Sequence, residues 1–136
     1  YELITMFDVL EHLYDPIKTV STINTKLKKG GYCVAYTPNI ISVGYELMES
    51  QQNTLVPFEH LCFFTIKSLE FLAKRTGFEI QKIETYGLDI MDYLLMKEYL
   101  DDIDYSNKLH EMMILIQSIL DKYEISNHFR VTFKKK

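Results

Sequence analysis

Hydrophobic residues along this chain form two kinds of pattern, short continuous runs and longer stretches with helical spacing. The first run, from Leu3 to Phe7, is almost entirely apolar and ends at Asp8. Such a run predicts a parallel strand in the middle of a sheet, buried on both faces. No cap, turn or linker precedes this run, so we expect the domain to have a first part upstream of Tyr1.

A helix is predicted after this strand. Asp15 offers an N-cap carboxylate, and Pro16 has the backbone angle favoured at the first helical position. Four apolar residues then recur at helical spacing: Ile17, Val20, Ile23 and Leu27. The segment from Lys28 to Gly31 supplies the stop signals, because lysines complement the helix dipole and a glycine can take the left-handed conformation after the last turn.

The middle of the chain begins with a second predicted strand. Residues 32–37 form an aromatic and β-branched run that Pro38 ends, and a right-handed crossover would join it to the first strand. Residues 38–64 show no sustained periodicity. A connection of that length is often an active-site lid or carries short helices of its own. Thr65 is the next N-cap candidate, and Gly77 ends the helix that it starts.

The C-terminal part predicts a strand, two helices and a last strand. Residues 78–86 have the pattern of a strand. The helical pattern from Asp89 to about Asp102 predicts the first helix, and Ser106 is the expected N-cap of the second helix. This second, methionine-rich helix carries an apolar stripe of Leu109, Met112, Met113, Ile116, Ile119, Leu120 and Tyr123. We interpret the stripe as core or interface packing rather than as a cofactor site. Residues 129–133 alternate apolar and polar, which predicts a strand with one dry face.

Composition narrows the classes of function. The 136 residues are 47% hydrophobic and 25% charged, which is typical of one soluble globular domain. The formal net charge of -4 argues against nucleic-acid binding, since neutralising phosphates needs clustered lysine and arginine. Cys33 and Cys62 lack zinc-site spacing, so a reduced, cytoplasmic setting fits best. No apolar run is long enough to cross a membrane, and no signal peptide opens the chain.

Polar side chains gather where the predicted strands end. Asp8, Glu11 and His12 follow the first strand, and Pro38 and Asn39 follow the second. In an open α/β sheet, ligands bind beyond the carboxyl ends of the strands. Spacing alone leaves two interpretations open for the first group. It is either a substrate-facing set of carboxylates and imidazole or a capped turn with solvated side chains.

Several segments resemble class I S-adenosylmethionine-dependent methyltransferases, especially relatives of the ubiquinone-biosynthesis O-methyltransferases. Phe7 to Pro16, with the sequence FDVLEHLYDP, resembles the segment around the family's fourth strand, and Leu27 to Tyr32 resembles the helix end before strand five. The other similar segments are Thr37 to Asn39, Glu59 to Thr65, Leu69 to Phe78 and Phe129 to Lys134. The similarity covers nearly the whole chain except the helices between Asp89 and Tyr123.

The resemblance implies an α/β fold with a partial Rossmann-like methyltransferase sheet and flanking helices. Its strands four to seven would lie in the order 4-5-7-6, with the last strand antiparallel. Residues 1–136 would form the C-terminal part of one methyltransferase domain, with a helical insertion at about 88–124. The five glycines form no G-x-G pattern, so the glycine-rich cofactor loop is missing and we expect this chain alone to be inactive. Strand four would be an exposed edge, which predicts a homodimer through that edge or through the methionine-rich helix.

The resemblance also implies S-adenosylmethionine as the cofactor and a small molecule as the methyl acceptor. Phe7 and Asp8 would border the cofactor. His12 and Glu11 would be catalytic, with His12 as the general base, although a substrate-positioning or structural histidine is an equal alternative. In the relatives, a Glu-x-x-Glu-His pattern here is linked to a divalent cation. Asp8 replaces the first glutamate in this chain, and we predict no metal site.

Three further residues are expected at the acceptor site. Pro38 and Asn39 would shape the floor of the pocket, and His60 would reach the acceptor from the long loop. The aromatic neighbours of His60 also allow a packed, hydrogen-bonded histidine. Two other functions stay open: a non-catalytic interaction module derived from a Rossmann-like fold, and, less favoured, a fragment of a nucleotide-dependent dehydrogenase.

Overall fold

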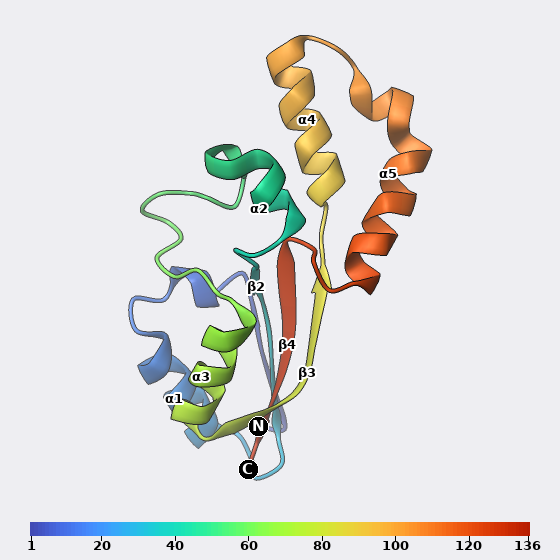
Figure 1. Ribbon diagram of the computed structural model, residues 1–136. Helices are drawn as coiled ribbons and strands as arrows, with labels where there is room; N and C mark the ends of the chain where they lie inside the picture. The colour runs from blue at the N-terminus through green and yellow to red at the C-terminus, as the bar shows by residue number, and fades with distance from the viewer.

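A four-stranded sheet forms the centre of the structure, a computed structural model that describes every residue of the chain (Figure 1). The strands β1 (Leu3–Phe7), β2 (Tyr32–Pro38), β4 (His128–Lys135) and β3 (Phe78–Tyr86) lie in that order across the sheet. β1 and β2 are parallel, whereas β4 runs antiparallel to both of its neighbours. This is the predicted order with its antiparallel last strand, so the α/β fold class is confirmed.

Two helices, α1 (Pro16–Lys26) and α3 (Ile66–Thr76), lie together on one face of the sheet (Figure 1). The core forms between this helix pair and the inward-facing side chains of the strands. Phe129, Val131 and Phe133 are fully buried there, which confirms the predicted dry face of the last strand. The core therefore occupies one side of the sheet only.

β1 is an edge strand, and its burial is partial. Leu3 and Phe7 are 56% and 57% exposed, while Met6 is buried in the core. The prediction that this run is buried on both faces is wrong for this chain, because no strand pairs with its outer side and no helix covers Phe7. The predicted exposed edge is confirmed.

The ends of α1 follow the sequence signals in part. The Asp15 carboxylate accepts a hydrogen bond from the Lys18 N–H at 2.9 Å, as an N-cap does. The helix ends at Lys26, earlier than predicted, and Gly30 takes its left-handed conformation (φ 74°) in the turn that follows. Glycine therefore serves the turn into β2 rather than the helix cap.

The ends of α3 match the prediction closely. The Thr65 hydroxyl accepts from the Ser68 N–H at 3.2 Å, and the Ser68 hydroxyl accepts from the Thr65 N–H at 2.8 Å, which forms a reciprocal capping box. Gly77 ends the helix with a φ of 77°. The long connection before Thr65 carries two short helices, α2 (Val43–Met48) and η2 (Glu49–Gln51), one of its two expected forms.

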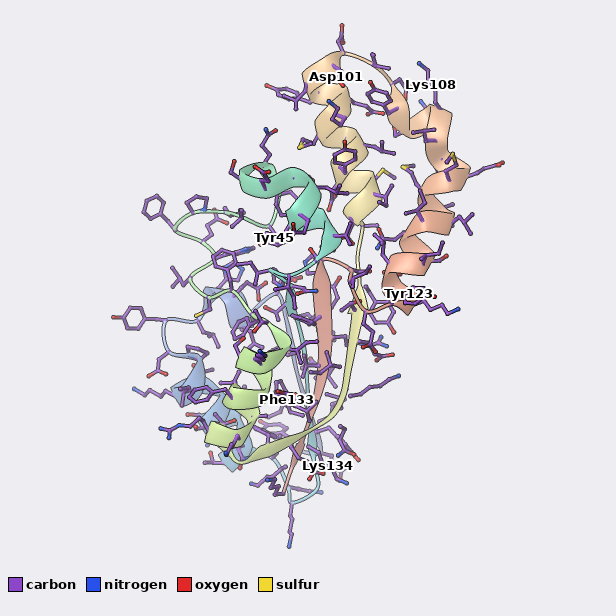
Figure 2. All side chains as sticks on the ribbon, viewed as in Figure 1. Tyr45, Asp101, Lys108, Tyr123, Phe133 and Lys134 are labelled. Carbon is purple, nitrogen blue, oxygen red and sulfur yellow. The ribbon has the colours of Figure 1, made fainter.

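A helical hairpin extends beyond the carboxyl end of β3 (Figure 1). It consists of α4 (Asp89–Asp101) and α5 (Tyr105–Lys122), and Asp101 and Lys108 lie near its tip (Figure 2). The prediction that Ser106 caps α5 is wrong, because the Asp104 carboxylate accepts from the Asn107 N–H at 3.0 Å and starts the helix earlier.

The apolar stripe of α5 is only partly covered. Met113 and Leu120 are buried, whereas Met112 and Tyr123 are exposed. The stripe thus serves as packing at two positions and leaves apolar surface at others. None of the helices combines the length and the hydrophobicity that a membrane-spanning segment needs.

Candidate functional site

The predicted site residues lie along one edge of the sheet, where β1 and β2 end and β4 begins. Phe7 is exposed at the end of β1 and lines an open hollow of about 360 Å³ with Tyr36, Tyr86 and Arg130. Asp8 turns the chain away with a left-handed φ of 52°, and its N–H donates to the Tyr36 carbonyl at 3.0 Å. The end of β1 is therefore open to a ligand.

Glu11 lies in the short helix η1 (Leu10–His12) and is 1% exposed. Its carboxylate accepts a hydrogen bond from the Thr37 hydroxyl at 2.8 Å, which connects η1 to β2. Its backbone carbonyl accepts from the N–H groups of Leu61 and Cys62 at 2.7 and 3.0 Å. A buried carboxylate held in this way excludes the interpretation that Glu11 is a solvated side chain.

The structure brings His12 and His60 together, although they lie far apart in sequence. His12 Nδ1 is 2.8 Å from the Glu59 carbonyl, and His60 Nδ1 is 2.6 Å from the Thr54 carbonyl. A carbonyl oxygen can only accept, so each Nδ1 carries the proton and each Nε2 has a free lone pair. The two rings meet edge to face with their centroids 4.7 Å apart.

Glu11, His12 and His60 together form what we call the His12 cluster. One ligand atom from each lies within 4.8 Å of the other two. A carboxylate oxygen and two imidazole lone pairs can receive a proton from a bound acceptor, and the same donor set suits a divalent transition metal. The absence of a metal site stays a prediction.

Pro38 and Asn39 are buried at the end of β2. The Asn39 amide donates to the Ser126 carbonyl at 2.9 Å and accepts from the Ile41 N–H at 3.1 Å. The Asn39 N–H donates to the Asn127 carbonyl at 2.8 Å. Asn39 thus fixes the loops around the site through bonds within the chain, and its contact with an acceptor stays a prediction.

A second group of polar residues lies at the same edge and was not identified from the sequence. Tyr36, Tyr86, Asp92 and His128 line a pocket of about 320 Å³, which we call the His128 pocket. The rings of Tyr36 and His128 stack with centroids 4.7 Å apart and an interplanar angle of 4°. The antiparallel direction of β4 brings His128, its first residue, to the carboxyl ends of β2 and β3. The expected antiparallel direction of the last strand is the one feature of the sequence analysis that could have placed His128 at this end of the sheet.

Burial shapes the protonation of the groups in the His128 pocket. It raises the pKa of Tyr36 to about 12, and the nearby Asp8 carboxylate acts in the same direction. Burial also raises the pKa of Asp92, which hydrogen bonds from Asn53 and Asn127 partly oppose.

For His128, burial lowers the pKa below 6.5. The carboxylates of Asp8, Glu11, Asp89 and Asp92 act in the opposite direction without reversing the shift. Burial therefore favours the neutral form of His128.

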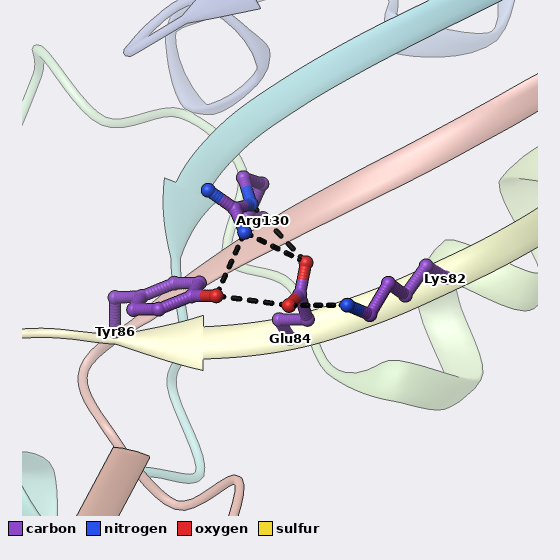
Figure 3. Close-up of polar contacts among 4 residues, drawn as sticks. All are labelled: Lys82, Glu84, Tyr86 and Arg130. Carbon is purple, nitrogen blue, oxygen red and sulfur yellow. Dashed lines mark hydrogen bonds and ion pairs between the residues drawn. The ribbon is translucent and has the colours of Figure 1, made fainter. Parts of the chain in front are cut away.

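A surface ion cluster fixes Tyr86 beside this pocket (Figure 3). Arg130 donates from Nε and Nη2 to one Glu84 oxygen at 3.2 and 2.9 Å, while Lys82 Nζ lies 2.6 Å from the other. The Tyr86 hydroxyl donates to Glu84 at 2.9 Å and accepts from Arg130 at 2.7 Å. Lys82 and then Arg130 lower the pKa of Glu84 to about 2. The cations near the pocket are thus paired with a carboxylate.

The fold is shared with solved methyltransferase structures. Phosphoethanolamine N-methyltransferase 2 of Haemonchus contortus, solved with S-adenosyl-L-methionine, is 22% identical with a TM-score of 0.57, over 100% of this chain and 33% of that one. A methyltransferase of Thermotoga maritima, named as a possible histamine N-methyltransferase, is 16% identical with a TM-score of 0.61. The match covers 99% of this chain and 56% of that one. A methyltransferase from Archaeoglobus fulgidus is 22% identical with a TM-score of 0.58, and the match covers 98% of this chain and 59% of that one.

The chain therefore spans between one third and about three fifths of the length of these structures. No curated protein matches its sequence. At the level of the family, a sequence model described as "Methyltransferase domain" matches residues 1–83, more than half of the chain. The His12 cluster and the open end of β1 both lie within this matched region. The chain belongs to the methyltransferase domain family.

Proposed function

We propose that this chain forms the acceptor side of an S-adenosylmethionine-dependent methyltransferase that acts on a small molecule. The observation that carries this proposal is the His12 cluster beside the exposed Phe7, at the carboxyl edge of a methyltransferase-family sheet. When bound, S-adenosylmethionine supplies a methyl group on a sulfonium, ready for transfer to a nucleophile. A relationship to the ubiquinone-biosynthesis O-methyltransferases is part of the proposal and rests on the FDVLEHLYDP segment.

Phe7 and Asp8 would border the cofactor. The hollow beside Phe7 is open, and the left-handed turn at Asp8 keeps the chain from folding back over it. These features fit the donor's methionine end, since an apolar wall and a nearby carboxylate suit an aliphatic chain with an amino group. The remaining donor contacts would come from the part of the fold that the longer neighbours contain and this chain does not span.

His12 would accept the proton of the methyl acceptor. The Glu59 carbonyl holds the proton of His12 on Nδ1, so Nε2 is left to act as a base. Glu11 would stabilise the imidazolium that forms, because its buried carboxylate is one of the three neighbouring groups of the His12 cluster. His60, Pro38 and Asn39 would complete the wall that positions the acceptor for attack on the methyl group.

The acceptor is proposed to be a small molecule in the cytoplasm. Two structural neighbours support this, since they are named for phosphoethanolamine and, as a possible activity, for histamine. The net charge of -4 supports the same assignment, because it disfavours nucleic acid.

A homodimer through the outer edge of β1 or through α5 is also proposed. The unpaired strand edge and the exposed Met112 support it. Sedimentation of the purified chain should show a concentration-dependent dimer, whereas a monomer at all concentrations would contradict it.

The exchange H12Q in the full-length protein tests the role of His12. Glutamine keeps a polar side chain but cannot accept the proton, so we expect turnover to fall by about 100-fold or more. The affinity for S-adenosylmethionine, measured by calorimetry, should stay within about twofold. H110Q is the matched control, because His110 is exposed on α5. Unchanged turnover in H12Q would remove His12 from the mechanism.

A further inference from the structure

A chain of three hydrogen-bonded side chains runs through the wall of the His128 pocket. The Asn127 amide nitrogen donates to the Asp92 carboxylate at 3.1 Å, and the Asn127 amide oxygen lies 2.9 Å from His128 Nδ1. Asn127 is buried, and its N–H donates to the carboxylate of Asp89 at 3.0 Å. We call Asp92, Asn127 and His128 the His128 cluster.

The hydrogen bonds of the His128 cluster fix which nitrogen of His128 carries the proton. A carboxylate only accepts, so Asn127 must turn its NH₂ group toward Asp92 and its oxygen toward His128. Nδ1 of His128 must then be the donor, and Nε2 has a free lone pair. Nε2 has no hydrogen-bond partner within the protein and is not fully buried, so it is accessible to a ligand.

The absence of a side chain at Gly87 makes room for this arrangement. A Cβ atom at that position would lie 2.1 Å from the Asn127 amide oxygen and 2.7 Å from the Asp89 carboxylate. No side chain fits at such distances, so Gly87 permits the close approach of Asn127. The packing of Asn127 against the turn between β3 and α4 therefore requires glycine at this position.

The pocket that His128 faces has a definite chemical character. It is lined by the Asp92 carboxylate, by the tyrosine rings of β2 and β3, and by the neutral imidazole, while no lysine or arginine lines it. Arg130 is paired with Glu84, and its guanidinium lies over the Tyr86 ring, 4.5 Å from the ring centroid. A carboxylate and aromatic faces attract a cation, and a lone pair on Nε2 accepts from an N–H donor.

The His128 pocket also adjoins the site of the proposed reaction. Tyr36 and Tyr86 line both this pocket and the open hollow beside Phe7. A molecule held in the His128 pocket can therefore extend past the two tyrosines toward the end of β1, where the donor is proposed to lie.

We propose that the His128 pocket is an anchoring site for the ammonium group of an amine-containing methyl acceptor. The ammonium group donates one N–H to His128 Nε2, pairs with Asp92 and lies beside the Tyr36 ring that stacks on His128. A protonated amine has no lone pair for attack, so this group is an anchor and a different atom of the acceptor is methylated. The inference rests on the proposed function, because it deepens the substrate class of that same edge of the sheet.

The tautomer of His128 is the first test, and it needs no enzymatic activity. In the full-length protein labelled with ¹⁵N-histidine, NMR should show neutral His128 with its proton on Nδ1 at neutral pH. The exchange D92N frees the Asn127 amide to turn over, so the Nε2-protonated form should appear. A wild-type protein with the proton on Nε2 would overturn the proposal.

Ligand selectivity is the second test, with phenethylamine as the cationic probe and 2-phenylethanol as its neutral match. Phenethylamine should shift the His128 ring signals saturably and bind at least tenfold more tightly than the alcohol. D92N should weaken phenethylamine by about 10- to 100-fold, as expected for a charge-assisted bond. D101N is the control, because Asp101 pairs with Lys97 far out on the hairpin. Equal binding of both probes, or no shift of His128, would overturn the assignment.

Two further arms separate this proposal from others. A peptide with one central lysine carries the same ammonium group, and binding as tight as that of phenethylamine would overturn the small-molecule part. S-adenosylmethionine binding is measured separately by calorimetry. Loss of donor binding with intact amine selectivity would refute the proposed function alone, whereas donor binding without amine selectivity would refute this inference alone.

Discussion

Two histidine sites lie at the same edge of the sheet, and they are fixed in different ways. In the His12 cluster, backbone carbonyls of the long connection hold Nδ1 of both histidines, and the carboxylate belongs to the short helix after β1. In the His128 cluster, an amide side chain relays a carboxylate to Nδ1. Both arrangements leave Nε2 free.

The two sites differ in how the hydrogen-bond partner of each histidine responds to nearby charge. His12 is exposed, and its partner is a carbonyl that keeps its direction whatever the charge nearby. His128 is half-buried, and the direction of its partner depends on the charge of Asp92. A backbone-held histidine suits proton exchange with a reacting group, whereas a carboxylate-directed one suits recognition of a cation. The comparison predicts that the two sites can be damaged independently.

The largest expected effect comes from D89A, which removes the support of the His128 cluster. The buried Asp89 carboxylate accepts from Gly44 N–H at 2.9 Å, Asn127 N–H at 3.0 Å and the Gln117 amide at 3.1 Å. Its loss leaves two buried N–H groups without partners, so unfolding by urea should become easier by about 3 to 5 kcal/mol. Amine binding should fall with it, and stability within 1 kcal/mol of wild type would contradict this account.

A smaller effect is expected from T37V, which weakens the His12 cluster instead. Valine keeps the shape of Thr37 but cannot donate to the buried Glu11 carboxylate, which should cost about 1.5 kcal/mol in unfolding free energy. Turnover should fall while phenethylamine binding stays unchanged. T132V is the matched control, because Thr132 lies on the open face of β4. A loss of amine binding in T37V would show that the two clusters are coupled.

The smallest effect concerns Glu84, beside but outside both clusters. Lys82 and Arg130 lower its pKa from 4.5 to about 2, so its pairing stabilises the fold fully above pH 4.5 and is lost as the pH falls toward 2. E84Q should lower stability by less than about 1 kcal/mol at pH 7, since the pairs are near the surface. The difference from wild type should vanish near pH 2 in thermal denaturation. A difference that grows in acid would have the wrong sign.

Local features of the fold could be predicted from the sequence. The cap at Asp15, the start of α3 at Thr65 and its end at Gly77 depend on bonds within a few residues, so the spacing of those residues was enough. At the start of α5 the predicted cap was Ser106, whereas the hydrogen bond from the Asn107 N–H shows that Asp104 caps the helix.

The candidate site was predictable only where it follows one strand. Asp8, Glu11 and His12 are neighbours in the sequence, and their place after an apolar run indicated the edge of a sheet. The meeting of His12 with His60 depends on the path of the long connection, which no periodicity in residues 38–64 describes. The His128 cluster depends on two segments, the start of α4 and the start of β4, which meet because β4 inserts between β2 and β3.

The sequence by itself determined the main helices and strands, the N-caps of α1 and α3 and, through family resemblance, the order of the strands. The tertiary structure alone decided that Glu11 is buried. It also decided that His128 faces a pocket with Asp92. The physical reason is range: helices and turns are set by contacts within a few residues, whereas burial and side-chain relays are set by strands that pair across the whole chain.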